Sequence, residues 1–482
     1  MTVTLVFTFA GIVLIGVLGF VGRRGPVADL SEWTVGGRRF GSVTMWFLQA
    51  GEVFTTFTFL GMAGLAFSGG VAAMYALPYI PIGYVVLFFL AKRLWTLGKE
   101  RGYLTQGDFL EDRYASKTLG TVSAVLGVLF VLPYLQLQIT GLGLIVKLVT
   151  GDAASSTLSM IIGCVGVVAF VLWAGLRGVA TTAYFKDAIM LIVLLVLLIA
   201  IPTYFAGGLG AMFEKVAQLH PEKLIVHAGA NDQTWFVTSM LVSAIGVGLM
   251  TLPHAWPAVM SARDPLVLRR NYTWMPIYEM CILLQMIVGF AAIIVLPKDA
   301  NSNGVLLTLS KEALPQWMTG LVVVAAISTA MVPAAGILIG ISSLVARNIV
   351  RVRDQRLQFW VNHGTVVAAC GLALVLGIVR PDLLANLLLL TYAGSAQLAP
   401  ANAFGFMKKV PVGKGPILAG LVVGELVVVW LTFVDTSAPF GTFNVGLIGL
   451  AANLVVIGVG VLAERLVGRS ATPAAAAAKE HV

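Results

Sequence analysis

Charged residues are scarce in this chain of 482 residues, since Asp, Glu, Lys and Arg supply only 11% of it, against about 25% in an ordinary globular domain. Hydrophobic residues supply 59%. A water-soluble domain needs more charge than this to cover its surface, and a disordered chain cannot leave so much apolar surface in water. The scarcity of charge therefore excludes both classes and leaves a polytopic membrane protein.

The sequence also lacks the motifs of several kinds of chemistry. It contains no Walker, GxSxG or HExxH pattern, so nothing in it supports ATP hydrolysis or intramembrane proteolysis. Its net charge of +9 is not gathered into a basic run with exposed aromatics, so no nucleic-acid partner is expected. The three cysteines, Cys164, Cys281 and Cys370, stand at no metal-ligand spacing and are interpreted as packing residues. We expect no enzyme, no cofactor and no metal beyond a coupling ion.

Thirteen mostly apolar stretches are long enough to cross the ~30 Å hydrocarbon core of a bilayer as helices. The first lacks the basic residues of a cleaved signal peptide, so we expect it to be retained. The fold class predicted is an all-α membrane protein with about 13 transmembrane helices in one domain, residues 1–465. The expected spans are 3–22, 42–67, 73–91, 118–149, 157–175, 188–206, 235–256, 273–296, 319–346, 359–379, 383–407, 416–434 and 443–464.

The orientation follows from the distribution of Lys and Arg. Of the 31 basic residues, all but Lys147, Lys215, Lys223, Lys298, Lys311 and Arg380 fall on one set of alternate loops or on the tail. The loop between the fifth and sixth spans, for example, carries Arg177 and Lys186. Because basic loops stay in the cytoplasm, we expect the N-terminus outside and the C-terminus inside the cell membrane. The tail, residues 466–482, is expected to be disordered.

Two spans carry candidate helix breaks at matching positions: Gln49–Glu52 in the second span and Gly246–Gly248 in the seventh. The two spans are five apart and so cross the membrane in opposite directions. Interrupted spans at matching positions mark the inverted repeats of transporters. We therefore predict two inverted five-helix repeats, spans 2–6 at about 42–206 and spans 7–11 at about 235–407. The alternative is that these glycines only let helices approach closely.

Three carboxylates fall within predicted spans, where a charge is costly and is by default a functional candidate. Glu52 stands beside the first break and is predicted to handle the cation or the solute; its alternative role is a hydrogen bond between helices. Glu279 is expected near the inner face, where it forms a candidate inner gate with His254 and His363. We have no functional account of Glu425 beyond a contact between helices or subunits.

The solute is expected near the membrane midplane, between spans 2, 4, 7, 9 and 11. Half-helix ends can meet it there, because free N–H groups favour an anion and free carbonyls favour a cation. Buried amides need partners, so Gln138 either binds solute or bridges helices. Segment 302–317 is predicted to be a short amphipathic helix and the outer lid. The candidate solute-binding residues are Thr55, Thr56, Tyr134, Gln138, Ser243 and Tyr392.

Several motifs, in order, resemble the sodium:solute symporter family. The resemblance covers residues 30–465 and implies the inverted-repeat fold of the leucine-transporter class. It also implies a secondary transporter that moves a small organic solute with a cation gradient. The matching segments are Glu32–Arg38, Phe59–Gly61 with Gly64–Gly70, Gly102–Thr105 with Asp108–Leu110, Arg113–Tyr114, and Leu132–Leu135 with Gln138 and Gly141.

The resemblance extends to a branch of this family. The segments Thr55–Gly61, Leu252–His254 and Leu268–Asn271 look like the branch that carries small monocarboxylates. Amino acids and other small solutes remain alternatives. A membrane sensor and a membrane enzyme are the rival classes, but the chain shows neither an output domain nor a catalytic constellation. The expected partners are the solute and the lipid bilayer, and the oligomeric state is not predicted.

The resemblance also implies a sodium site. In the family, two backbone carbonyls beside the first break, here at Gly51 and Phe54, hold the ion together with a Ser–Thr pair in span 9. That pair falls on Val332–Pro333 in this chain. Ser328–Thr329 lie four residues earlier, about 6 Å along a helix. The sodium site is therefore expected to be incomplete, and H⁺ coupling through Glu52 is the alternative to Na⁺.

Overall fold

The computed structural model describes residues 2–22, 30–151, 155–352, 354–435 and 437–466. Within these ranges the chain forms helices and no β-strand; one isolated bridge pairs Phe40 with Ala262. This confirms the all-α class. The tail predicted to be disordered lies outside the described residues from position 467 onward.

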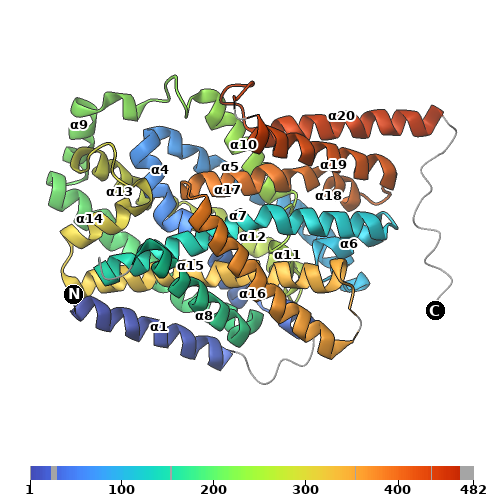
Figure 1. Ribbon diagram of the computed structural model, residues 1–482, viewed down its shortest axis with the longest axis horizontal. Helices are drawn as coiled ribbons and strands as arrows, with labels where there is room; N and C mark the ends of the chain where they lie inside the picture. The colour runs from blue at the N-terminus through green and yellow to red at the C-terminus, as the bar shows by residue number, and fades with distance from the viewer. Residues whose placement is uncertain (1, 23–29, 152–154, 353, 436, 467–482) are drawn as a thin grey trace.

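The helical elements follow one another along the whole described chain (Figure 1). Elements labelled η are short turns of 3₁₀ or π helix. In order they are α1 Thr2–Gly22, α2 Leu30–Val35, η1 Gly36–Arg38, α3 Ser42–Val53, η2 Phe57–Gly61, α4 Met62–Gly69, η3 Gly70–Tyr75, α5 Ala76–Arg101, α6 Gln106–Arg113, α7 Lys117–Thr150, α8 Ser156–Ala206, α9 Leu209–Leu219, η5 Pro221–Leu224, α10 Gln233–Gly248, α11 Ala255–Met260, α12 Pro265–Glu279, α13 Ile282–Val295, η6 Ser302–Gly304, α14 Val305–Ala313, α15 Gln316–Leu344, η7 Val345–Ile349, α16 Gln355–Val379, α17 Leu384–Ser395, η8 Ala396–Leu398, α18 Ala399–Phe406, α19 Lys414–Val429, η9 Trp430–Val434 and α20 Val445–Leu466.

Eight helices in the described part of the chain are long and apolar enough to cross a membrane by themselves. Two shorter apolar helices in the same ranges are Val6–Gly22, within α1, and Gln233–Gly248, which is α10. Figure 1 shows α7 and α15 running through the middle of the bundle, with α1 and α8 on one side and α19 and α20 on the other. The exact number of thirteen spans and their inverted repeat remain predictions.

Helix α15 forms the centre of the bundle. Nearly all of its 29 residues are buried, and it packs against α1, α7 and α8. A helix that is apolar on every side is stable only where protein or lipid surrounds it on every side. In this molecule protein surrounds α15, so the helix can brace both candidate breaks from within.

Helix α8 differs from the expectation of two spans joined by a loop at 176–187. Helical structure runs from Ser156 to Ala206 and is interrupted only at Gly175, whose φ of 56° and ψ of −178° are not helical. Lys186 is consequently fully buried inside the second half of α8. The prediction that Lys186 lies in a cytoplasmic loop is wrong. The excess of Lys and Arg on the predicted cytoplasmic loops remains when Lys186 is left out.

Both expected interruptions lie close to their predicted positions. Helix α3 ends at Val53, and Phe54–Thr55 are non-helical before the chain turns again into η2, so this break begins two residues after Glu52. Helix α10 ends at Gly248, as the glycines predict, and α11 begins only at Ala255. We refer to Phe54–Thr55 as the first break and to residues 249–254 as the second break.

The segment 302–317 contains the short helix that its amphipathic pattern predicts. Helix α14 buries one apolar face, which includes Val305, Leu306 and Leu309. The Asn303 side chain joins the segment to the start of α17, because it donates to the Asp382 carbonyl and accepts from Leu384 N–H, both at 3.1 Å. Its role as an outer lid remains a prediction.

Candidate functional site

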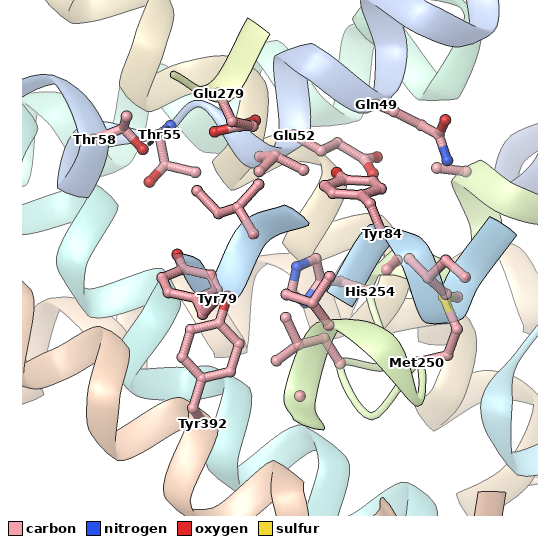
Figure 2. A pocket seen from close by; sticks show the side chains of 18 of the residues that line it. Gln49, Glu52, Thr55, Thr58, Tyr79, Tyr84, Met250, His254, Glu279 and Tyr392 are labelled. Carbon is pink, nitrogen blue, oxygen red and sulfur yellow. Dashed lines mark hydrogen bonds between the residues drawn. The ribbon is translucent and has the colours of Figure 1, made fainter. Parts of the chain in front are cut away.

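The two breaks open onto one cavity (Figure 2). Its walls come from α3, η2, α5, α7, α10, α11, α12, α13 and α17, so both predicted repeats contribute. The cavity volume is about 90 Å³, which is room for about three water molecules at their volume in the liquid. In this conformation the cavity therefore suits a solute of only a few non-hydrogen atoms.

Two carboxyl groups line the cavity. Glu52 stands two residues before the first break, and Glu279 is the last residue of α12. Both side chains are buried, and one oxygen of each has no hydrogen-bond partner among the described residues. A Cβ atom added at Gly336 of α15 would lie 2.8 Å from the Glu52 Oε1 atom, so a larger residue at position 336 would displace this carboxyl group from its present position.

Aromatic rings form much of the remaining wall. The ring centroids of Tyr79 and Tyr392 are 5.9 Å apart, and those of Tyr134 and His254 are 5.3 Å apart. In Figure 2 the two carboxyl groups lie on one side of the cavity, Tyr79 and Tyr392 lie on the opposite side, and His254 lies between them. The wall thus combines apolar surface with hydroxyl and imidazole groups that can orient a small polar solute.

Tyr79, Tyr84 and Tyr272 were missed as candidates although they line the cavity. Their sequence signal was available, because a tyrosine within an apolar span buries a hydroxyl that needs a partner. The sequence-based prediction weighs amides and carboxylates in the spans, and among the tyrosines it selects only Tyr134 and Tyr392.

The predicted solute-binding residues divide into two groups. Thr55, Tyr134 and Tyr392 line the cavity. Thr56 and Gln138 lie beside it and bond to each other, since Thr56 Oγ1 donates to Gln138 Oε1 at 2.6 Å. The Gln138 side-chain NH₂ has no partner among the described residues and remains a possible donor.

The sixth candidate, Ser243, is buried in α10. Its hydroxyl donates to the Ser239 carbonyl of its own helix at 2.8 Å, and Ser243 does not line the cavity. A serine bonded to the carbonyl four residues earlier satisfies its hydrogen within the helix. Its oxygen can still accept a hydrogen bond, and its role in solute binding remains a prediction.

The predicted cation-binding residues surround the first break on two sides. Gly51 and Phe54 belong to the end of α3 and to the break itself. On α15 the hydroxyls of Ser328 and Thr329 both donate to the Ala325 carbonyl of their own helix, at 2.8 and 2.6 Å. Within the described residues, neither hydroxyl forms a hydrogen bond with a carbonyl of the first break. The proposed cation-binding set remains a prediction.

Val332 is the α15 residue that faces this break. A Cβ atom added at Gly51 would lie 3.3 Å from Val332 Cγ1 and 2.9 Å from Ala183 Cβ, so α3, α8 and α15 meet here at close range. The resemblance placed a hydroxyl ligand at the position of Val332, and the side chain found there is apolar. Hard cations prefer oxygen ligands, so this side of the break supplies none from residue 332.

An unexpected ion pair lies against the first break. The Lys186 ammonium donates to Asp187 Oδ1 at 2.8 Å, to the Gly51 carbonyl at 3.3 Å and to the Ala50 carbonyl at 3.4 Å. Both side chains are fully buried, and the Tyr278 hydroxyl also donates to Asp187 Oδ1. Asp187 is a fourth buried carboxylate in addition to the three that were expected.

The signal for this pair was visible in the sequence as adjacent residues of opposite charge. The sequence pattern predicts a loop at 176–187, and in a loop Lys186 and Asp187 would be ordinary surface residues. The structure has a helix there instead. A loop and a buried helix differ here only in the register of one hydrophobic stretch, and a 12-residue window of moderate hydropathy does not separate the two.

The three residues of the proposed inner gate do not form one group. His254 and Glu279 line the cavity. His363 lies elsewhere, on α16, where its ring centroid is 3.8 Å from that of Phe359 and 5.3 Å from that of Trp33. Gating by any of the three remains a prediction.

Glu425 lies away from the breaks, on α19. Neither of its side-chain oxygens has a partner among the described residues, and it borders an apolar hollow lined by residues such as Phe130 and Val429. Across the described ranges, no group of three or more His, Cys, Asp or Glu side chains is arranged to hold a metal ion.

A helical membrane bundle with two interrupted helices facing one small cavity defines a secondary transporter. The model of the sodium:solute symporter family matches residues 33–412, and the chain belongs to this family. Cation-coupled symport of a small solute, rather than an enzymatic reaction, is accordingly the activity of its class.

Three comparisons describe the relatives. The uncharacterized symporter YhjB of Bacillus subtilis (strain 168) is 32% identical, with 99% of each chain covered. A monocarboxylate transport permease protein of Rhizobium johnstonii is 28% identical over 92% of this chain and 93% of that one. The structure of a Na⁺-coupled sialic acid symporter has a TM-score of 0.79 at 14% identity and covers 96% of this chain and 97% of that one, which shows the shared fold.

Proposed function

We propose that this protein carries a small monocarboxylate into the cell together with a cation. The observation that carries the proposal is the cavity between the two breaks, which is small and holds two carboxyl groups, Glu52 and Glu279. The name of the Rhizobium relative supports the solute class. The family supports coupling to a cation.

The carboxyl groups explain why solute and cation would travel together. An anionic solute placed beside Glu52 and Glu279 meets like charges in a buried site, which disfavours its binding. A bound cation, or a proton on one of the carboxyl groups, removes that repulsion. Binding of the anion and of positive charge therefore favour each other, which is the thermodynamic requirement of symport.

Donors for the solute carboxylate are present in the cavity wall. Tyr79, Tyr134 and Tyr392 place hydroxyl-bearing rings in the cavity wall, and Thr55 lies at the start of the half-helix that begins with η2. The N-terminal end of a helix favours an anion. The small volume of the cavity, about 90 Å³, favours a short carboxylate such as pyruvate or lactate over a larger solute.

The coupling ion within this proposal is Na⁺ or H⁺. The candidate cation-binding set is Gly51, Glu52, Phe54, Ser328 and Thr329. A sodium ion needs several oxygen ligands, whereas a proton needs a single titratable group, which Glu52 supplies. Glu52 is thus the member of the set that serves either ion.

An amino acid is the second candidate solute, and one observation favours it. The unpartnered oxygens of Glu52 and Glu279 could accept hydrogen bonds from an ammonium group as well as face a coupling ion. An amino acid would then bring its own positive charge to the two carboxyl groups.

Uptake into proteoliposomes separates these candidates. The purified full chain is reconstituted, a Na⁺ or H⁺ gradient is imposed, and accumulation of radiolabelled pyruvate, lactate, acetate and proline is measured. We expect concentrative uptake of at least one monocarboxylate. Accumulation of proline alone would select the amino-acid alternative, and the absence of any gradient-driven accumulation would reject cation-coupled symport.

We also propose the orientation with the N-terminus outside and the C-terminus in the cytoplasm of the cell membrane. The support is the asymmetry of Lys and Arg between alternate loops. A fluorescent reporter that matures only in the cytoplasm, fused after residue 482, should be active. Activity of a reporter that works only outside the membrane would overturn the orientation.

A further inference from the structure

Lys186 lies at a place where a buried charge is costly and so needs a specific reason. It stands on α8 one turn after Ala183, the residue that packs against Gly51. Residues three apart share a face of a helix, so the Lys186 side chain extends along the contact between α8 and α3. Its ammonium reaches the carbonyls of Ala50 and Gly51 in the last turn of α3.

These carbonyls need a donor because α3 ends at the first break. The Ala50 carbonyl still accepts from Phe54 N–H at 3.0 Å. The N–H of Thr55, which would continue the helix onto Gly51, is directed instead to Thr58 Oγ1 at 3.4 Å. The last carbonyls of a helix also carry its partial negative charge. The Gly51 carbonyl is thus a natural ligand for a cation.

The Lys186 ammonium makes as many contacts as it has hydrogens. A lysine ammonium has three N–H donors, and the three oxygens within reach are those of Ala50, Gly51 and Asp187. The Lys186 Nζ atom also lies over the Phe54 ring, 5.6 Å from its centroid, in a cation–π contact. The ammonium is therefore coordinated by oxygens and a ring face, as a bound inorganic cation would be.

The charged and titratable groups near the Lys186 ammonium lie on three of the helices packed around it, α8, α12 and α3. Asp187 on α8 is the paired carboxylate, and Tyr278 on α12 donates to it. Glu279 follows Tyr278, and Glu52 follows Gly51 on α3. Helix α15 carries no titratable residue and presents Val332 to the break. Residue 332 therefore supplies no oxygen ligand for a second cation, and the hydroxyls of Ser328 and Thr329, one turn away, donate to the Ala325 carbonyl of their own helix.

We propose that the Lys186 ammonium is a tethered cation that fills the cation position at the first break, so that transport requires no sodium ion there. The proposal rests on the chain being a cation-coupled transporter and narrows the ion that this site accepts. A sodium ion coordinated by the same carbonyls would lie within about 4 Å of the ammonium, where like charges repel strongly in a dry site. The two cations therefore exclude each other.

The test measures sodium binding without any solute. Thermal melting of the purified full chain in detergent is followed while NaCl replaces choline chloride at constant ionic strength. The wild type should show no saturable rise in Tm with Na⁺. Lys186→Ala removes the ammonium and leaves the Ala50 and Gly51 carbonyls with the Asp187 carboxylate, so this variant should gain a saturable, Na⁺-specific rise of several degrees.

Lys147→Ala, a change of a lysine near the end of α7, is the matched control and should behave as the wild type. A saturable rise with Na⁺ in the wild type, or the absence of any rise in a folded Lys186→Ala variant, would overturn the proposal. If Lys186→Ala does not fold, wild-type uptake with Na⁺ replaced by choline decides. Uptake within about twofold of the full rate, a change below ~0.4 kcal/mol, supports the tethered cation, and collapse to background rejects it.

These outcomes stay separate from those of the proposed function. The melting experiment involves no solute, so the result for Lys186 stands even if the transported solute is not a monocarboxylate. Conversely, sodium-dependent uptake of pyruvate would uphold the proposed function while removing the tethered cation.

Discussion

The two breaks solve the same problem in different ways. At the first break the last carbonyls of α3, of which Gly51 has lost its helical donor, are met by a charged donor, the Lys186 ammonium. At the second break the Leu249 and Met250 carbonyls are met by neutral donors. The Asn402 side-chain amide reaches both, at 2.8 and 3.0 Å, and the Trp256 indole reaches Met250 at 2.8 Å.

The two breaks differ in the charge of the donors that bind their carbonyls. An amide or an indole satisfies a carbonyl without adding net charge, so the second break is held by fixed neutral bonds. An ammonium requires a counter-ion, and Asp187 is buried with it. The charged bonds at the first break respond to ions and protonation, whereas the neutral bonds to the Leu249 and Met250 carbonyls do not. The titratable side chain within the second break is His254, which lines the cavity without taking part in these bonds. Any sensitivity of transport to ions is therefore expected at the first break and not at the second.

The largest expected effect comes from unbalancing the charge at the first break. Asp187→Asn keeps the shape of the side chain but leaves the Lys186 ammonium without its carboxylate. Breaking a buried ion pair from one side typically costs about 3–5 kcal/mol. We expect a loss of this size in the free energy of unfolding, measured by denaturant titration in detergent micelles.

The double variant Lys186→Met with Asp187→Asn serves as the control, because it removes both charges at once. It should be clearly more stable than Asp187→Asn alone, since no uncompensated charge stays buried. If Asp187→Asn is as stable as the wild type, the pair does not hold the first break and the contrast between the breaks is wrong.

A smaller effect is expected at the neutral break. Asn402→Leu removes the side-chain donor of the Leu249 carbonyl, whereas the Met250 carbonyl keeps the Trp256 indole. An unsatisfied buried polar group costs about 1–3 kcal/mol. We expect a loss of stability in that range and no change in the response to Na⁺. Asn386→Leu, an exposed asparagine of α17, is the matched control and should stay within about 0.5 kcal/mol of the wild type. A Na⁺ response that appears in Asn402→Leu would contradict the neutral role of this break.

A third change separates coupling from folding at the first break. Glu52→Gln keeps the volume of the side chain next to Gly336 but removes its charge and its proton. We expect expression to be unchanged and concentrative uptake to fall about tenfold, the size of a lost charged hydrogen bond of about 1.5 kcal/mol.

Glu425→Gln provides the comparison for Glu52→Gln, because Glu425 is also buried with unpartnered oxygens but lies on α19, away from both breaks. Its uptake should stay within about twofold of the wild type, a difference of less than ~0.4 kcal/mol. Full accumulation by Glu52→Gln at every pH would reject a coupling role for Glu52.

The apolar stretches of the sequence, together with the glycines and polar residues that interrupt them, predicted the all-α class and the positions of both breaks. The glycines at 246–248 marked the end of α10, and the polar run at 49–52 placed the first break to within two residues, because Gly and buried polar groups weaken a helix locally. The register of α8 could not be read in the same way. Residues 176–187 mix charged and apolar side chains, and only their contacts with α3 and α12 show that Lys186 is buried.

The candidate site was foretold less completely than the fold. Thr55, Tyr134 and Tyr392 line the cavity, as the midplane argument predicts, and Glu52 lines it beside the first break. Glu279, expected near the inner face, lines the same cavity. The pairing of Thr56 with Gln138 depends on how α7 packs against the break, and such packing between distant segments leaves no local trace in the sequence. The same reason hid the approach of the Lys186 ammonium to the Gly51 carbonyl.

The smallest effect is expected from Tyr392, which touches the second break from the cavity. A Cβ atom added at Gly246 would lie 2.5 Å from Tyr392 Cδ1, so this ring is held against the end of α10. Tyr392→Phe keeps the ring and removes only the hydroxyl. If that hydroxyl donates to the solute, its loss costs about 0.5–1.5 kcal/mol, which is a two- to tenfold rise in KM with little change in the maximal rate.

Measurement of uptake against solute concentration checks this change, with Tyr204→Phe on the exposed face of α8 as the control that should leave KM unaltered. The response to Na⁺ should match that of the wild type, because the hydroxyl belongs to the neutral break and carries no charge at neutral pH. An unchanged KM would remove Tyr392 from the solute site. A changed ion response would instead show that the two breaks share one ionic site, and the contrast between a charged and a neutral break would no longer hold.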